Sequence, residues 1–213
     1  SELCSILHAD FQKDQLMKQF WEERYAEPEY AYGVAPNQFL KEQLELFAPG
    51  TILFPADGEG RNSVYAATQG WEVSAFDMSQ EGKKKADALA AEQGVAIDFK
   101  VGLIQELEYP KESFDALVLI YAHFPPEHRK AFHQRLAEFL KPGGVLILEG
   151  FSKEHLAFSE KNPKAGGPKN VDMLFSIEEL QEDFNGFDFL ECCGQTIELN
   201  EGLKASQQIN GQY

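Results

Sequence analysis

The sequence has a shortage of basic residues. It contains 19 Lys and Arg against 35 Asp and Glu, for a net charge of −16, and none of the basic residues falls between Lys169 and Lys204. Proteins that bind nucleic acid neutralise phosphate groups with Lys and Arg. The composition therefore argues against DNA, RNA and acidic membrane surfaces as partners. The only basic run, residues 83–85, is expected to be a solvated helix face.

Cysteine is also scarce. Cys4, Cys192 and Cys193 form neither a disulfide framework nor a CxxC pair. Neighbouring residues in a strand point to opposite faces, so Cys192 and Cys193 are expected to act separately, as buried small side chains. The five histidines are scattered along the chain. No metal site is expected.

Long apolar runs and targeting patterns are missing as well. No apolar stretch approaches the ~20 residues that cross a bilayer, and the N-terminus lacks a basic-then-apolar signal pattern. A length of 213 residues with 43% hydrophobic and 12% aromatic residues suits one globular domain over residues 1–213. We expect a soluble, cytoplasmic protein, monomeric or homodimeric, whose partner is a small molecule.

The most informative stretch is residues 51–79. An apolar run ends at Pro55, the glycine-spaced residues 56–60 follow, and after a helical pattern a second apolar run stops at Asp77. This order predicts a strand, a tight turn, a helix, and a second strand with an acid at its tip. Such an arrangement is half of a nucleotide-binding α/β unit.

Each residue type in this unit has a chemical reason. Gly58 and Gly60 lack a Cβ atom, so the chain can turn sharply and a ligand can approach bare backbone. Free amides at the start of the following helix attract an anionic group. Asp77, about 20 residues on, is placed to accept hydrogen bonds from ribose hydroxyls.

The rest of the chain continues this alternation of helices and strands. Residues 114–120 form a near-continuous apolar run, as expected of a central parallel strand that is buried on both faces. Five alternating strands predict an α/β fold with a doubly wound parallel sheet. Helices are expected over 11–25, 37–47, 79–94, 127–140 and 176–184, and strands over 52–54, 71–77, 96–101, 114–120, 145–148, 187–199 and 203–213.

Three motifs together carry a family resemblance. ILFPADGEGRN followed by Asp77, then SFDALVLIYAHFP, then LKPGGVLILEG resemble the class I S-adenosylmethionine-dependent methyltransferases. The likeness is to their small-molecule branch around tellurite-resistance and thiopurine methyltransferases, and it runs from Trp21 to about Glu201. It implies a seven-stranded, mostly parallel Rossmann-like sheet whose last strand is antiparallel. That strand is doubtful, because KASQQINGQY has little β character.

The resemblance also implies a cofactor and a reaction. S-adenosylmethionine would donate a methyl group to a small acceptor, a soft nucleophile such as a thiol or a selenium or tellurium oxyanion, and leave S-adenosylhomocysteine. Two positions depart from the family: its first glycine is Ala56, and the acid of its third motif is Leu103. With Leu103 there, no side-chain carboxylate is expected for the adenine amino group, only apolar packing and the Ile104 amide. The cofactor-binding residues implied are Ala56, Asp57, Gly58, Glu59, Gly60, Asn62, Asp77, Met78, Leu103, Ile104 and Tyr121.

Charge at the turn separates this cofactor from a dinucleotide. The dinucleotide fingerprint places Gly or Ala where this chain has Ser63. Asp57 and Glu59 would repel a pyrophosphate, whereas they suit a cofactor that carries a sulfonium cation beside an amino acid. The residues themselves thus favour S-adenosylmethionine over NAD.

The loop after residue 120 is the place to look for the acceptor, because ligands sit beyond the carboxyl ends of strands. His123 is the candidate general base, with Tyr121 beside it, since its ordinary pKa lies near neutrality; the alternative is that His123 only packs in the loop. Residues 1–36 form a helix and an aromatic loop that is a possible lid over the cofactor. The substrate-pocket candidates are Trp21, Tyr25, Tyr32, His123, Phe124, Arg129 and Phe151.

Two other functions remain open on the sequence. Ala56, Leu103 and the weak last strand fit a non-catalytic protein that binds S-adenosylmethionine or another nucleotide. An NAD-dependent oxidoreductase is the third reading, which Ser63 and the paired acids disfavour.

Overall fold

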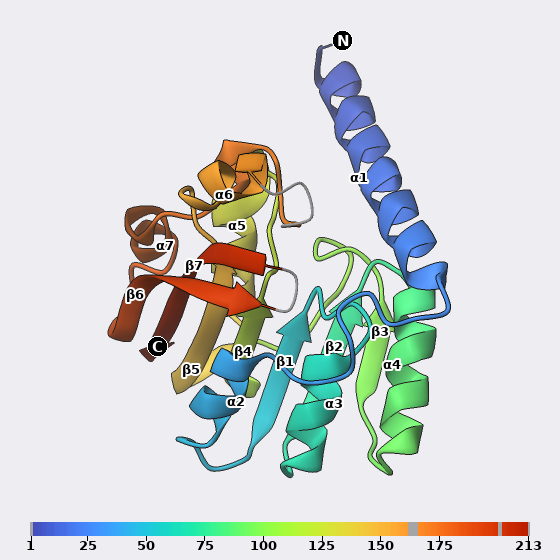
Figure 1. Ribbon diagram of the computed structural model, residues 1–213, viewed down its shortest axis with the longest axis vertical. Helices are drawn as coiled ribbons and strands as arrows, with labels where there is room; N and C mark the ends of the chain where they lie inside the picture. The colour runs from blue at the N-terminus through green and yellow to red at the C-terminus, as the bar shows by residue number, and fades with distance from the viewer. Residues whose placement is uncertain (1, 162–165, 200–201, 213) are drawn as a thin grey trace.

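Seven strands form one sheet in the order β3-β2-β1-β4-β5-β7-β6, with helices on both faces (Figure 1). The computed structural model describes residues 2–161, 166–199 and 202–212. The strands are β1 (Thr51–Pro55), β2 (Glu72–Asp77), β3 (Asp98–Val101), β4 (Phe114–Ile120), β5 (Leu140–Phe151), β6 (Asp188–Leu199) and β7 (Gly202–Gln212). The helices are α1 (Glu2–Ala26), α2 (Gln38–Leu44), α3 (Arg61–Thr68), α4 (Gln80–Glu92), α5 (Pro126–Ala137), α6 (His155–Lys161) and α7 (Ile177–Asp183), with a 3-10 turn η1 (Val171–Met173).

The sheet confirms the predicted fold class. Strands β1 to β5 run parallel to one another, and β7 runs antiparallel to both β5 and β6. The carboxyl ends of the five parallel strands therefore meet at one edge of the sheet, which is where an α/β protein binds its ligand.

The doubt about the last strand was wrong. The backbone of β7 pairs with β5 from Gln212 to Ser206 and with β6 along its whole length. An interior strand is held by hydrogen bonds on both sides, and this pairing outweighs the weak β propensity of its residues.

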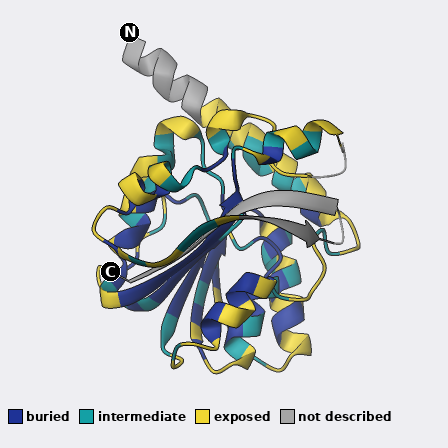
Figure 2. Ribbon diagram, turned by 60° about the vertical axis from the view of Figure 1, so that its left-hand side comes forward, coloured by how far each residue is buried: buried dark blue, intermediate teal, exposed yellow. Residues whose placement is uncertain are grey.

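The core has two layers, one on each face of the sheet, because the strands are apolar on both faces. Ile52 and Phe54 of β1 pack with α2, α3 and α4, whereas Leu53 points to the other face, toward α5 and α7. Alternation along a strand produces this division. Figure 2 shows the buried residues concentrated along the sheet between the two helix layers.

Three smaller expectations need correction. Helix α1 begins at Glu2 rather than near residue 11. Lys85 of the basic run is mostly buried, with 15% of its side chain exposed, because it pairs with Glu59. Cys192 and Cys193 are half-buried rather than buried, while the side chain of Cys4 lies outside the described residues.

Within the described part of the chain, no helix has the length and apolar character needed to cross a bilayer.

Candidate active site

The turn after β1 has the conformation that its glycines predict. The φ angles of Gly58 and Gly60 are +63° and +84°, in the left-handed region that costs glycine little. A Cβ atom at Gly60 would lie 2.5 Å from the Cβ of Ala86 in α4. Gly60, the N-cap of α3, therefore also lets α3 approach α4 closely. Ala56 adopts φ +51° without being glycine, which stores a modest backbone strain of ~1 kcal/mol.

Asp77 joins the tip of β2 to this turn. Its Oδ2 accepts the Gly58 amide at 2.9 Å and its Oδ1 accepts the Ser79 amide at 2.9 Å. Burial raises the pKa of Asp77 to about 6, although both backbone amides lower it. Each carboxylate oxygen has a second lone pair, so a ligand hydroxyl still has an acceptor here. The geometry fits the ribose-binding role, which stays a prediction.

The turn gathers the acidic side chains that its sequence suggested. Asp57 accepts a hydrogen bond from the Ser63 hydroxyl, and desolvation raises its pKa to about 8, with the nearby Asp77 adding to the rise. Glu59 is buried and accepts from the Ala31 amide at 2.8 Å and from Lys85 Nζ at 2.7 Å. A cationic group placed here would be stabilised by the carboxylates.

The aromatic loop after α1, residues 27–37, is held against the turn by hydrogen bonds. Besides the contact between Glu59 and Ala31, the Asn37 amide donates to Asn62 Oδ1 at 2.9 Å, and the Tyr30 hydroxyl donates to the Lys85 carbonyl at 3.1 Å. Asn62 is buried and its carboxamide oxygen supports this loop, while its cofactor-binding role stays a prediction. The loop therefore forms a fixed wall of the site.

Helix α1 projects beyond the carboxyl edge of the sheet (Figure 1), and its C-terminal half contacts the turns that follow β1, β2 and β3. A Cβ atom at Gly58 would lie 2.6 Å from the Tyr25 hydroxyl, so Tyr25 covers the turn after β1. The Glu22 carboxylate accepts from the Ser79 hydroxyl at 2.8 Å and from two amides of the first turn of α4. Asp14 accepts from Gln105, beyond β3, at 3.0 Å.

Glu22 and Asp14 are site-edge residues that the sequence analysis missed. With Trp21 and Tyr25, whose rings stack at 5.3 Å, they recur at helical spacing on one face of α1. The signal was available as Asp14, two turns before Trp21, and Glu22, between Trp21 and Tyr25, but nothing local indicated the partners of these two acids.

The turn after β3, where the resemblance implies that adenine lies, holds an acid that the sequence analysis did not consider. Ile104 is buried in the core, and Leu103 is half-buried. The Leu103 amide, however, donates to Oε2 of Glu106 at 3.0 Å. A side-chain carboxylate therefore does reach this turn, although Leu103 occupies the place of the acid. Met78, after β2, is half-buried.

His123 is held by backbone groups on both ring nitrogens. Its Nε2 accepts the Phe151 amide at 3.0 Å, so its Nδ1 carries the proton and donates to the Met173 carbonyl at 2.7 Å. The ring stacks between Phe151 and Phe175, at centroid distances of 5.5 and 4.4 Å. Desolvation lowers the pKa of His123 to about 4. This geometry does not fit the general-base role, and His123 instead fastens the loop after β4 to β5 and η1.

Tyr121 and Phe151 lie together where β4 and β5 end. Their rings are 4.6 Å apart, and Tyr121 has φ +53°, which turns the chain sharply at the strand end. The His155 ring stacks on Phe151 at 4.5 Å. These rings form an aromatic cluster where β4 and β5 end, and the pocket-wall role of Tyr121 and Phe151 stays a prediction.

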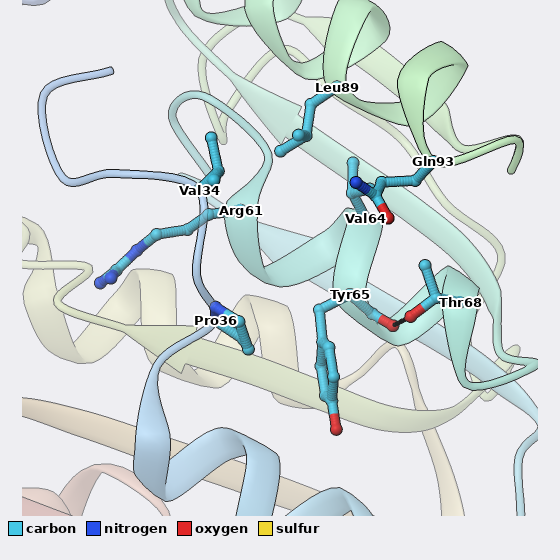
Figure 3. Close-up of a pocket in the computed structure, with 8 residues that line it drawn as sticks. All are labelled: Val34, Pro36, Arg61, Val64, Tyr65, Thr68, Leu89 and Gln93. Carbon is cyan, nitrogen blue, oxygen red and sulfur yellow. Dashed lines mark hydrogen bonds between the residues drawn. The ribbon is translucent and has the colours of Figure 1, made fainter. Parts of the chain in front are cut away.

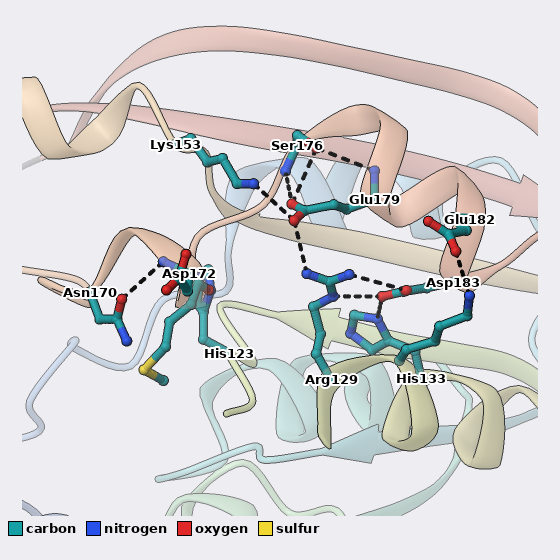
Figure 4. A network of polar contacts seen from close by, with 12 residues as sticks. His123, Arg129, His133, Lys153, Asn170, Asp172, Ser176, Glu179, Glu182 and Asp183 are labelled. Atoms are coloured by element: carbon teal, nitrogen blue, oxygen red, sulfur yellow. Dashed lines mark hydrogen bonds and ion pairs between the residues drawn. The ribbon is translucent and has the colours of Figure 1, made fainter. Parts of the chain in front are cut away.

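Arg129 belongs to a network that joins α5 to α7. Its Nε donates to Asp183 at 2.8 Å and its guanidinium also pairs with Glu179 at 3.2 Å. The buried carboxylate of Asp183 also binds His133 Nδ1 at 2.8 Å, and Lys153 reaches Glu179 (Figure 4). Arg129 was a candidate for an anionic substrate, but its charge is neutralised within the protein.

Two further pocket candidates are Phe124 and Tyr32. Phe124 packs edge-on against Phe132 of α5. Tyr32 is 41% exposed, with the guanidinium groups of Arg24 and Arg61 over its ring.

A hollow of about 150 Å³ lies between the aromatic loop, α3 and α4 (Figure 3). Its lining includes neither the glycine turn nor Asp77, so it is separate from the candidate site. It is lined by Val34, Pro36, Arg61, Val64, Tyr65, Thr68, Leu89 and Gln93.

No group of three or more His, Cys, Asp or Glu in the described residues could hold a metal ion.

The chain is similar in sequence to known methyltransferases. A family model for a methyltransferase domain covers residues 52–144. A relative named ubiquinone biosynthesis O-methyltransferase, from Xanthomonas euvesicatoria, is 31% identical over 136 residues, which are 62% of this chain and 55% of the relative. The chain spans about half the length of the curated relatives it matches.

Solved structures share the fold over almost the whole chain. One comes from work on the conversion of a disulfide bond into a thioacetal group during echinomycin biosynthesis. It has a TM-score of 0.71 at 18% sequence identity, and the match covers 92% of each chain. TehB from Haemophilus influenzae has a TM-score of 0.69 at 16% identity, over 92% of this chain and 66% of its own. Residues 52–144 are therefore similar to a methyltransferase domain, and the chain shares the fold of these solved structures.

Proposed function

We propose that this protein transfers a methyl group from S-adenosylmethionine to a small molecule whose acceptor atom is a soft nucleophile, such as a thiolate or a reduced selenium or tellurium species. The choice of acceptor rests on His123, whose two ring nitrogens are both occupied by hydrogen bonds. Both of its nitrogens bind backbone groups, so it has no free lone pair to remove a proton. A thiolate needs no general base, whereas an alcohol or amine usually does.

The residues at the ends of β1 and β2 suit this cofactor. Asp77 would hold the ribose, and the backbone of Gly58 would border the ligand. Asp77 would supply negative charge for a sulfonium or ammonium group, and a cation bound here would also favour ionisation of Asp57, whose pKa is raised to about 8 in the ligand-free protein. When bound, S-adenosylmethionine supplies a methyl group that its positive sulfur has already activated.

The protein's part in the reaction is then positioning. The acceptor's lone pair forms a bond to the methyl carbon while the carbon–sulfur bond breaks, and the thiol proton has left to water beforehand. The Tyr121 and Phe151 rings would hold a soft, polarisable acceptor and exclude water. Correct placement of two reactants contributes up to ~7–11 kcal/mol to such reactions.

The test is a methylation screen with labelled S-adenosylmethionine. We expect transfer to small thiols, selenite or tellurite, with rates that rise as the acceptor itself ionises. Binding of S-adenosylmethionine with no transfer to any acceptor would support the non-catalytic reading. Absence of binding would contradict the proposal as a whole.

A second candidate is O-methylation of a phenolic ring. It is favoured by the similarity to the Xanthomonas relative, whose name describes O-methyl transfer in ubiquinone biosynthesis. Catechols belong in the same screen: transfer to a catechol but to no thiol would select this candidate.

A further inference from the structure

The strand order decides where the base of the cofactor would lie. Strands β1, β2 and β3 are consecutive neighbours, with the glycine turn after β1 and Asp77 at the end of β2. A nucleoside whose ribose lies at Asp77, and whose other end lies over the turn, extends its base toward the end of β3. Asp77 pairs in register with Val101, the last residue of β3. The Gly102 amide also donates to the Asp77 carbonyl at 3.0 Å. The turn after β3 therefore directly borders Asp77, the residue that is proposed to bind the ribose.

Glu106 places a carboxylate at this turn. The Leu103 carbonyl accepts the Glu106 amide at 2.9 Å, and the Leu103 amide donates back to Oε2 of Glu106 at 3.0 Å. These two bonds hold the side chain against the backbone of Leu103. Glu106 is exposed, and the bond to Leu103 uses one of its two carboxylate oxygens, Oε2.

We propose that Glu106 accepts a hydrogen bond from the amino group of the adenine base, replacing the acid that is absent at Leu103. This inference rests on the proposed cofactor. A carboxylate accepts from a 6-amino group but repels the carbonyl oxygen of a 6-oxo purine. Glu106 therefore makes the site selective for adenine over hypoxanthine, and Leu103 provides apolar contact beside it.

The experiment measures binding by calorimetry rather than turnover. S-adenosylhomocysteine and its 6-oxo analogue, S-inosylhomocysteine, are titrated into the wild-type protein, Glu106→Gln and Glu108→Gln. Gln keeps an oxygen for the Leu103 amide, so the turn is preserved, while its NH2 group faces the base. Glu108 is the matched control: it lies two residues away, is exposed, and pairs with Arg135 at 3.0 Å.

The wild-type protein should prefer S-adenosylhomocysteine about tenfold or more, the size of a charged hydrogen bond. Glu106→Gln should lose about tenfold in affinity for S-adenosylhomocysteine, and the preference should vanish or reverse because the new NH2 group can donate to the 6-oxo group. Glu108→Gln should keep the wild-type ratio. A thermal melt confirms that each variant is folded, and Glu106→Ala should also lose the preference.

The same ratio in Glu106→Gln and the wild-type protein would overturn the inference while leaving the cofactor intact, because Glu106 would then serve only to close the turn. A wild-type protein that binds neither compound would overturn both the inference and the proposed function.

Discussion

The carboxylate of Asp77 accepts the amide of Gly58 at 2.9 Å, across the gap between the end of β2 and the turn after β1. Its second oxygen accepts the amide of Ser79, the N-cap of α4. One buried side chain thus fixes the relative positions of β2, the glycine turn and α4. Asp77 shapes the turn in addition to offering a ligand an acceptor.

Asp77→Asn should therefore weaken both binding and folding. Asn keeps one acceptor oxygen, but its NH2 group faces a backbone amide that needs an acceptor, and the charge toward ribose is lost. We expect affinity for S-adenosylhomocysteine to fall about tenfold or more and the melting temperature to drop. Asp87→Asn, an exposed change on α4 that removes only the pair with Lys83, is the control. Unchanged affinity in Asp77→Asn would place the ribose elsewhere.

Ala56→Gly should stabilise the protein. The positive φ of Ala56 costs ~1 kcal/mol that glycine does not incur, partly offset by the greater freedom of glycine in the unfolded chain. We expect a net gain of up to ~1 kcal/mol in the free energy of unfolding, measured by urea titration.

The reverse change provides the matched control for Ala56. Gly94 has φ +68°, and a Cβ atom there would meet nothing within 4 Å, so Gly94→Ala reports backbone strain without a clash. Gly94→Ala should lower the free energy of unfolding by ~1 kcal/mol. A loss of stability in Ala56→Gly would show that the Ala56 methyl group makes a contact worth more than the strain.

The elements that the sequence predicted well are those whose signal is local. The glycine turn, Asp77 and the alternating strands follow from residue type and period within some 30 residues. Glu22 and Glu106 were missed because their partners depend on how α1 and the turn after β3 are placed. His123 was located correctly in its loop, but Met173, fifty residues away, decides its chemistry. The strand β7 was doubted because propensity was judged without its two neighbours.

Asp57 makes the stability of the ligand-free protein depend on pH. Its folded pKa is raised from 3.8 to about 8, so the folded state binds a proton more tightly than the unfolded state. The stabilisation is complete below pH 4 and is lost as the pH rises through 8. Between pH 6 and 8.5 the free energy of unfolding of the wild-type protein should fall by ~2.5 kcal/mol relative to that of Asp57→Asn, measured by urea titration. Parallel curves for the two proteins would show that the Asp57 carboxyl is better solvated than its surroundings indicate.

His123→Phe should separate a structural histidine from a catalytic one. Phe can keep the stacking between Phe151 and Phe175 but removes both hydrogen bonds, which leaves a backbone amide and a carbonyl without their partner. We expect a loss of ~2–4 kcal/mol in the free energy of unfolding. Because the pKa of His123 lies near 4, the pH dependence of kcat/KM with a thiol between pH 6 and 9 should keep its shape and follow the acceptor's ionisation.

The control for this variant is His128→Phe on α5, where the His128 ring stacks on Phe132; a small change in stability is expected. If His123 were the general base, the wild-type profile would show a limb near neutral pH that His123→Phe abolishes. Such a limb would contradict the clamped geometry. It would also move the proposed acceptor from a thiolate toward a hydroxyl group, because only the latter needs its proton removed by the protein.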